Sequence, residues 1–214
     1  MERRFSCTAC GKCCFGWLTL TLKDALALAA RFPLVVIWTP VRQGTKSFSI
    51  SAQLGLTLRL SKRRHLAVRI APTAYIPPSF ACPSLMPDGL YSIHTDKPSR
   101  CRTMPFFPYR EEGDQADLLI PRTGWRCDTS PEAPVVYRDK KIVERQDFDD
   151  ERDELFSQAS TLRSYGEWLL ESSPPLKDEL IRVAKKRMGG HVVVNFSTLL
   201  PHLPKVDVVE FAAK

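Results

Sequence analysis

The stretch CTACGKCC, residues 7–14, places four of the chain's seven cysteines within eight positions. Cys7 and Cys10 are separated by two residues, so the turn between them can bring both sulfurs to about 2.3 Å from one metal ion. Cys10 and Cys13 repeat this spacing. Cys13 and Cys14 are adjacent and do not easily bind the same ion. The run therefore indicates either a centre with more than one metal or two sites that divide the ligands.

Length and composition indicate one globular domain, or one domain with a modest appendage, because 214 residues are enough to bury a core. The longest apolar run, FPLVVIW at residues 32–38, is far shorter than the roughly 18 residues of a membrane span. The first residues lack the apolar segment of a secretory signal, so we expect a cytoplasmic protein. Thiols stay reduced in the cytosol, and clustered cysteines there favour metal or redox chemistry over disulfides.

The net charge of +7 raises the question of a polyanionic partner. The densest basic stretches are RLSKRRHLAVR at residues 59–69 and AKKRMGG at residues 184–190. Neither stretch is interleaved with aromatic residues, and we interpret them as a solvated hairpin turn and a helix C-terminus. We therefore expect no nucleic-acid partner and no membrane partner, whereas a protein partner stays open.

Local patterns predict secondary structure on both sides of a central hairpin. In TLTLKDALALAARFP, residues 19–33, Thr21 and Asp24 form a capping-box pattern at the start of a helix. Apolar and polar residues alternate in FSISAQLGLTLRLS and HLAVRIA, residues 48–61 and 65–71, which predicts a β-hairpin.

Farther along the chain, ADLLIP at residues 116–121 and PVVYRDKKIVER at residues 134–145 are strand candidates. Residues 147–172 and 172–190 have the start and stop signals of two helices. The apolar stripe of the first helix consists of Leu155, Ala159, Leu162 and Leu169. Residues 191–214 are ambiguous.

These patterns predict an α+β fold with a small, cysteine-stapled metal-binding core, antiparallel strands and C-terminal helices. We place the cysteine-cluster domain at residues 1–146 and a mainly helical region packed on it at residues 147–214. Cys82, Cys101 and Cys127 fall in predicted loops, where ligands are usually presented.

Basic residues flank the cysteines, and nearby cations lower thiol pKa values. They are Arg3, Arg4, Lys12, Arg100, Arg102 and Arg126. Part of the net charge is thus expected to compensate thiolates locally. His65, His191 and His202 have no partner motif, so we expect surface or core roles for them.

The run CTACGKCC, the following LTLKDALALA and the later CPSL and DGLYSIHTDKPSRCRTMPF resemble the YkgJ-type cysteine-cluster family. That family is described as a zinc- or iron-chelating domain. The same segments are similar to the cysteine-rich part of flagellin lysine N-methylases, which implies an iron–sulfur centre. The resemblance covers about residues 5–130. It implies that all the cysteines are metal ligands, namely Cys7, Cys10, Cys13, Cys14, Cys82, Cys101 and Cys127.

The chain departs from the family pattern at one position. Tyr91 stands where the family typically has a further cysteine. A Tyr91 phenolate or the imidazole of His94 is an alternative ligand, and an altered or open metal position is another. We favour the altered or open position, because a lone histidine is more often structural than ligating.

Three functions are weighed. The first is a metal-binding protein whose zinc or iron, including an iron–sulfur cluster, organises the fold. The second is an iron–sulfur enzyme of the oxidoreductase or protein-methyltransferase type, although the sequence has no GxGxxG and no CxxxCxxC motif. The third is a zinc-stapled module that binds nucleic acid or protein. We take the first as the expectation and leave enzymatic activity undecided.

Overall fold

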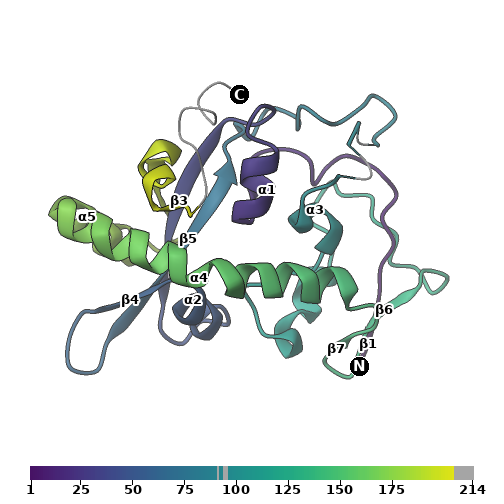
Figure 1. Ribbon diagram of the computed structural model, residues 1–214. Helices are drawn as coiled ribbons and strands as arrows, with labels where there is room; N and C mark the ends of the chain where they lie inside the picture. The colour runs from purple at the N-terminus through teal and green to yellow at the C-terminus, as the bar shows by residue number, and fades with distance from the viewer. Residues whose placement is uncertain (91, 94–95, 205–214) are drawn as a thin grey trace.

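The structure is a computed structural model that describes residues 1–90, 92–93 and 96–204 (Figure 1). It contains two antiparallel sheets and several helices, which confirms the predicted α+β class. The larger sheet has the order β2 (Leu18–Thr19), β5 (His65–Ala74), β3 (Leu34–Arg42) and β8 (Val192–Asn195), and β4 (Leu56–Arg59) also pairs with β5. The smaller sheet consists of β1 (Glu2–Arg4), β6 (Val135–Arg138) and β7 (Lys141–Ile142).

The long β3–β5 ladder forms the centre of the larger sheet, with pairs that run from Leu34 and Ala74 to Arg42 and Leu66. The apolar run at residues 32–38, which is too short for a membrane span, supplies most of β3. A continuous apolar run of this length is typical of a strand covered on both faces. No helix within the described ranges is long and apolar enough to cross a bilayer.

The predicted hairpin is confirmed for β4 and β5, but its first part is wrong. Phe48–Leu54 forms helix α2 instead of a strand. Ile50 and Leu54 are four residues apart, so a helix also places them on one face, where they pack with Tyr109 and Leu155. The seven residues fit both the alternation of a strand and the spacing of a helix. Burial of the face with Ile50 and Leu54 favours the helix.

The strand predicted at residues 116–121 is also wrong, because Ala116–Leu119 forms the 3₁₀ helix η2. The strands predicted at residues 134–145 are confirmed, since β6 and β7 pair across the predicted turn. Asp139 and Lys140 in that turn both have positive φ, which is the backbone that a tight hairpin requires.

The predicted helices are confirmed. In α1 (Leu22–Ala27) the Thr21 hydroxyl accepts a hydrogen bond of 3.1 Å from the Asp24 backbone N–H. Helices α4 (Gln146–Ser172) and α5 (Pro174–Lys185) follow, and in α4 Leu155, Ala159 and Leu162 are buried as predicted. The remaining helices are α3 (Ser99–Thr103), η1 (Glu112–Asp114), η3 (Phe196–Thr198) and η4 (Leu200–His202).

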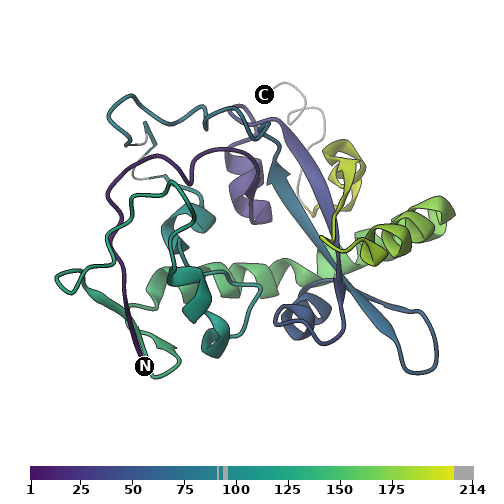
Figure 2. The ribbon, with the colours of Figure 1, turned by 180° about the vertical axis from the view of Figure 1, so that it is seen from behind.

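Helix α4 runs the length of the molecule and joins its two ends (Figures 1 and 2). The N-terminal segment, α3 and the small sheet lie at one end, whereas α5 and the β4–β5 hairpin lie at the other. The main core draws on both sides of the proposed division at residue 146, with Trp38 and Ile70 from one side and Tyr165, Leu180 and Phe196 from the other. That division stays a prediction.

Candidate metal centre

The first half of the cysteine run lies against the segment that contains Cys127. Ser6 and Asp128 exchange two backbone hydrogen bonds of 2.8 and 2.9 Å. The Thr8 hydroxyl donates to the backbone carbonyl of Arg126 at 2.9 Å. This pairing continues from the β1–β6 ladder, so a short antiparallel connection carries the beginning of the run to Cys127.

The second half of the run lies against the segment that contains Cys82. The Cys82 backbone N–H donates to the carbonyl of Cys14 at 2.7 Å, and Phe15 and Ala81 form an antiparallel bridge. The Sγ atoms of Cys13 and Cys14 are 3.7 Å apart. The end of the run at Cys14 is therefore held against the Cys82 segment.

Gly89 fixes the middle of the run. Its φ of +81° is a backbone conformation that favours glycine, and a Cβ atom there would overlap the carbonyl oxygen of Ala9. Ala9 lies directly before Cys10 and itself has a φ of +52°. Backbone contacts thus hold the run at both ends and at its centre.

Cys101 lies on helix α3 and not in a loop, which corrects the prediction from sequence. The first N–H of this helix, that of Ser99, donates to the Asp24 carboxylate of α1 at 2.9 Å. The Thr103 hydroxyl donates to the Asp147 carbonyl of α4 at 3.2 Å and to the Ser99 carbonyl at 2.9 Å. Helix α3 has only five residues, so these contacts, more than its own length, set the position of Cys101.

A buried ion pair also ties α3 to α4. The Arg100 Nη1 and Glu151 Oε2 atoms are 3.3 Å apart, and the side chains are only 7% and 4% exposed. Arg100 also donates to the carbonyl of Phe106. Burial raises the pKa of Glu151, and the charge of Arg100 opposes that rise. Arg100 is therefore paired with a carboxylate. Its charge still lowers the pKa of Cys101, but burial and the charges of Cys82 and Cys13 raise that pKa more.

The pKa shifts of two cysteines identify their neighbours, because charge interactions weaken with distance. Burial raises the pKa of Cys101 to about 12, and the next causes are the charges of Cys82 and Cys13. Burial also raises the pKa of Cys127, followed by the charges of Cys10, Cys7 and Cys13. Cys13 belongs to both neighbourhoods. The cysteines thus fall into two groups that meet at Cys13.

Cys10 differs from the buried thiols. Hydrogen bonds from the backbone at Arg126 and then at Lys12 lower the pKa of Cys10. These donors favour the thiolate and so prepare Cys10 to bind a cation. Two of the basic side chains predicted to do this, Arg100 and Arg102, are instead paired with Glu151 and Asp147.

The donor set fits a thiophilic metal in kind, because soft thiolates select zinc, copper(I) and iron–sulfur centres. Its geometry is not a closed ligand sphere. Within residues 1–90, 92–93 and 96–204, no three His, Cys, Asp or Glu side chains are grouped closely enough to hold an ion. The alternative ligands Tyr91 and His94 lie outside the described residues. Binding of a metal would thus require the thiols to move inward.

Two of the histidines have packing roles. His191 packs edge-on against Trp17, with ring centroids 4.1 Å apart. His202 lies between Tyr165 and Trp168, at centroid distances of 5.5 and 4.6 Å.

A cavity of about 560 Å³ adjoins the cysteines. Cys13 and Cys101 lie in its wall together with the cationic side chains Lys12 and Arg122 and with exposed apolar ones such as Trp17 and Phe15. Arg110 also lines the cavity, but its charge is paired with Asp117. The cavity offers space for an organic molecule with an anionic group directly beside two thiols.

Comparisons with models of protein families, with curated proteins and with solved structures find no match to this chain. Function has therefore to be inferred from the arrangement of the chain's own residues. Three contacts that shape the centre were not predicted from sequence: Asp24 with Ser99, Arg100 with Glu151, and Gly89 with Ala9. Each joins segments far apart in the chain, and no local pattern marks such a pairing.

Proposed function

We propose that this chain is a metal-binding protein with a Cys-ligated centre of zinc or iron, including an iron–sulfur cluster. One observation supports the proposal above the others. The segments of Cys82, Cys101 and Cys127 come from distant parts of the chain, and each of these cysteines neighbours cysteines of the run at residues 7–14. Membership of the YkgJ-type family, which the motifs suggest, belongs to the same proposal.

A cation would relieve an electrostatic conflict in this region. Thiolates raise one another's pKa values, as the shifts of Cys101 and Cys127 reflect, so several thiolates are unfavourable together without a compensating charge. A bound metal supplies that charge and is bound with release of the thiol protons. The ion pairs of Arg100 with Glu151 and of Arg102 with Asp147 reduce the share of this role that these two arginines can take.

The neighbour relations favour two ligand groups that share Cys13. The first group consists of Cys7, Cys10 and Cys127, and the second of Cys82, Cys101 and Cys14. Metal binding is then coupled to ordering of the loops that carry the thiols, because the ligand sphere is not closed beforehand in the part of the chain that the structure describes. The metal would act as a staple between the N-terminal segment and the loops around it.

The test is elemental analysis of protein purified without oxygen, together with absorption and EPR spectra. We expect zinc or iron to co-purify with the chain and the Cys10→Ser variant to lose metal and thermal stability. His191→Gln is the matched control, because it removes a side chain that could bind a metal but that packs against Trp17 instead. A wild-type protein without metal, whose melting temperature does not respond to a chelator, would falsify the proposal.

The second candidate function is an iron–sulfur enzyme, and the cavity beside Cys13 and Cys101 favours it. A purely structural staple has no need of a substrate-sized space at its ligands. The same anaerobic preparation decides this point. A coloured, EPR-active centre supports the enzyme, whereas colourless protein that contains zinc alone contradicts it.

A further inference from the structure

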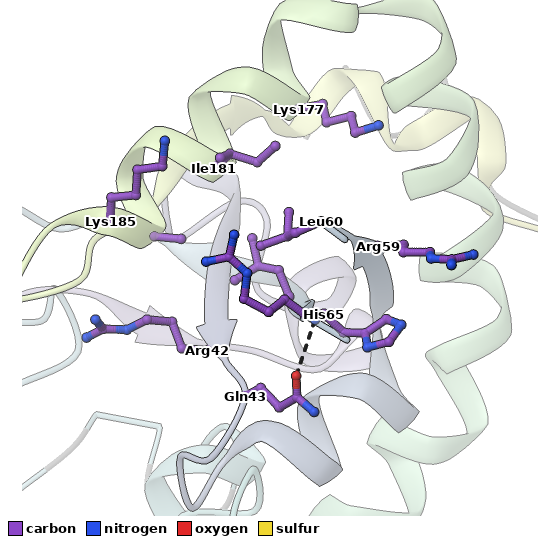
Figure 3. A pocket seen from close by; sticks show the side chains of 11 residues that line it. Arg42, Gln43, Arg59, Leu60, His65, Lys177, Ile181 and Lys185 are labelled. Atoms are coloured by element: carbon purple, nitrogen blue, oxygen red, sulfur yellow. Dashed lines mark hydrogen bonds between the residues drawn. The ribbon is translucent and has the colours of Figure 1, made fainter. Parts of the chain in front are cut away.

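A second cavity, of about 670 Å³, lies at the other end of the molecule between β3, the β4–β5 hairpin and α5 (Figure 3). Five positively charged side chains line it: Arg42, Arg59, Arg64, Lys177 and Lys185. The two basic stretches that sequence analysis interpreted as separate solvated surfaces both contribute to this cavity. The fold has brought them together, although they are far apart in the chain.

The positive charge of this cavity is not balanced locally. Among the described residues, no Asp or Glu lines the cavity, and none of its five Lys and Arg side chains forms an ion pair with a carboxylate. Arginines elsewhere do have such partners, as Arg110 has Asp117 and Arg145 has Glu112. Like charges on facing walls focus a positive potential in the space between them.

The secondary structure holds the charges on two facing walls. Lys177, Ile181 and Lys185 are four residues apart on α5 and so share one stripe of the helix. They lie across the cavity from Arg42 and His65 (Figure 3). The His65 backbone N–H donates to the side chain of Gln43 at 3.3 Å, which ties the hairpin to the end of β3.

Part of the cavity wall is apolar, and the positive charge continues outside the cavity. Leu66 and Ala184 are buried in its wall, and Leu60 is partly exposed. Beyond the cavity, the hairpin turn and the end of α5 carry further exposed cations, namely Lys62, Arg63, Lys186 and Arg187. The basic surface is thus longer than the cavity itself.

We propose that this groove binds the phosphate backbone of a single strand of nucleic acid without reading the base sequence. A chain of phosphates repeats its charge at short intervals, and the exposed cations likewise continue from the groove onto the hairpin turn and the end of α5. Among the described residues, no Phe, Tyr or Trp lines the groove, so base stacking there is limited to the ring of His65 and the phosphate backbone is the main recognised feature. The proposal departs from the expectation drawn from sequence because the convergence of the two basic stretches was not visible there.

The geometry favours a strand over a compact anion. All five cations are exposed at the rim of an open groove, whereas a site for one small phosphate compound encloses its ligand and needs fewer charges. An acidic protein surface carries its carboxylates less densely than a nucleic acid carries its phosphates. The proposal is independent of the metal centre, which lies at the opposite end of α4.

The test is fluorescence anisotropy of the full chain with a labelled, mixed-sequence RNA strand of about 12 nucleotides at several salt concentrations. If all five side chains neutralise phosphates, log affinity falls with log salt at a slope of about −3.5 for a single strand, or about 100-fold between roughly 50 and 200 mM. The double variant Lys177→Gln with Lys185→Gln should reduce that slope by about 1.4 and the affinity about 25-fold near 0.1 M salt.

The matched control replaces Lys140 and Lys141, which carry the same charge in the β6–β7 hairpin at the far end (Figure 1). We expect this control to leave the slope unchanged. Equal losses in both double variants, equal competition by polyglutamate or by a nucleoside triphosphate, or binding only to anionic lipid vesicles would each overturn the proposal. Cys10→Ser protein should bind RNA as the wild type does, so failure of the metal proposal is seen separately.

Discussion

Replacement of Gly89 by alanine tests whether backbone contacts set the position of the cysteine run. A Cβ atom at Gly89 would overlap the carbonyl oxygen of Ala9, which is a main-chain atom that cannot rotate away. Relief of this overlap requires the run to move away from the loop of Gly89. Since Ala9 precedes Cys10, that movement displaces a thiol whose pKa is lowered by hydrogen bonds from the surrounding backbone.

Gly44 provides the matched control for the magnitude. Its φ of +86° is close to the +81° of Gly89, but a Cβ atom at Gly44 would meet nothing within 4 Å. Alanine at either position costs about 1–2 kcal/mol for the left-handed backbone. At Gly89 the overlap adds about 1–3 kcal/mol, as for other overpacked sites. Gly89→Ala should therefore melt about 2–12 °C below Gly44→Ala, from about 2–4 °C for each kcal/mol in a chain of this size.

The assay is thermal unfolding of both variants by circular dichroism under reducing, oxygen-free conditions, with metal content measured on the same samples. We expect Gly89→Ala to unfold at the lower temperature and to retain less metal, and Gly44→Ala to retain the wild-type metal content. Equal melting temperatures and equal metal contents would refute the reasoning, because they would show that the run does not depend on this contact.

Two further predictions concern the surroundings of Cys101. Glu151→Ala leaves Arg100 buried without its partner, so we expect a loss of about 3–5 kcal/mol in unfolding free energy, measured by urea titration; a loss below about 1 kcal/mol, on the scale of an exposed pair, would contradict the buried pair. In metal-free protein, alkylation by iodoacetamide should modify Cys10 at a lower pH than Cys101, since backbone hydrogen bonds lower the pKa of Cys10 and burial raises that of Cys101 to about 12. Mass spectrometry of peptides across a pH series measures both rates, and modification of Cys101 before Cys10 would contradict these environments.

The sequence predicted those elements whose signals are local. The Thr21 cap, the β6–β7 turn and the apolar stripe of α4 each depend on residues within a few positions of one another, and all three were confirmed. The strand predicted over Phe48–Leu54 failed because alternation and helical spacing coincide over seven residues. Only the distant partners Tyr109 and Leu155 decide between them.

The candidate centre was predictable in composition but not in arrangement. Density of cysteines alone singled out residues 7–14, since thiols at such short spacings in a reducing cell mostly serve metal binding or redox chemistry. The division into two groups around Cys13 could not be predicted, because it depends on which loop each half of the run contacts. The short helix under Cys101 was missed for the same reason, as Asp24 and Glu151 stabilise it from other elements.

Helix α4 supports the surroundings of both proposed sites. Its first half fixes α3 through Asp147 and Glu151, and so serves the thiols. Its second half packs beneath the larger sheet at Gly166, where the absence of a side chain lets the helix approach Ile70 closely. The groove is built on that sheet and on α5, whose buried side chains belong to the main core, and Cys82 packs at the edge of that core. If the proposed metal is bound, its loss should loosen the cysteine end more than the walls of the basic groove.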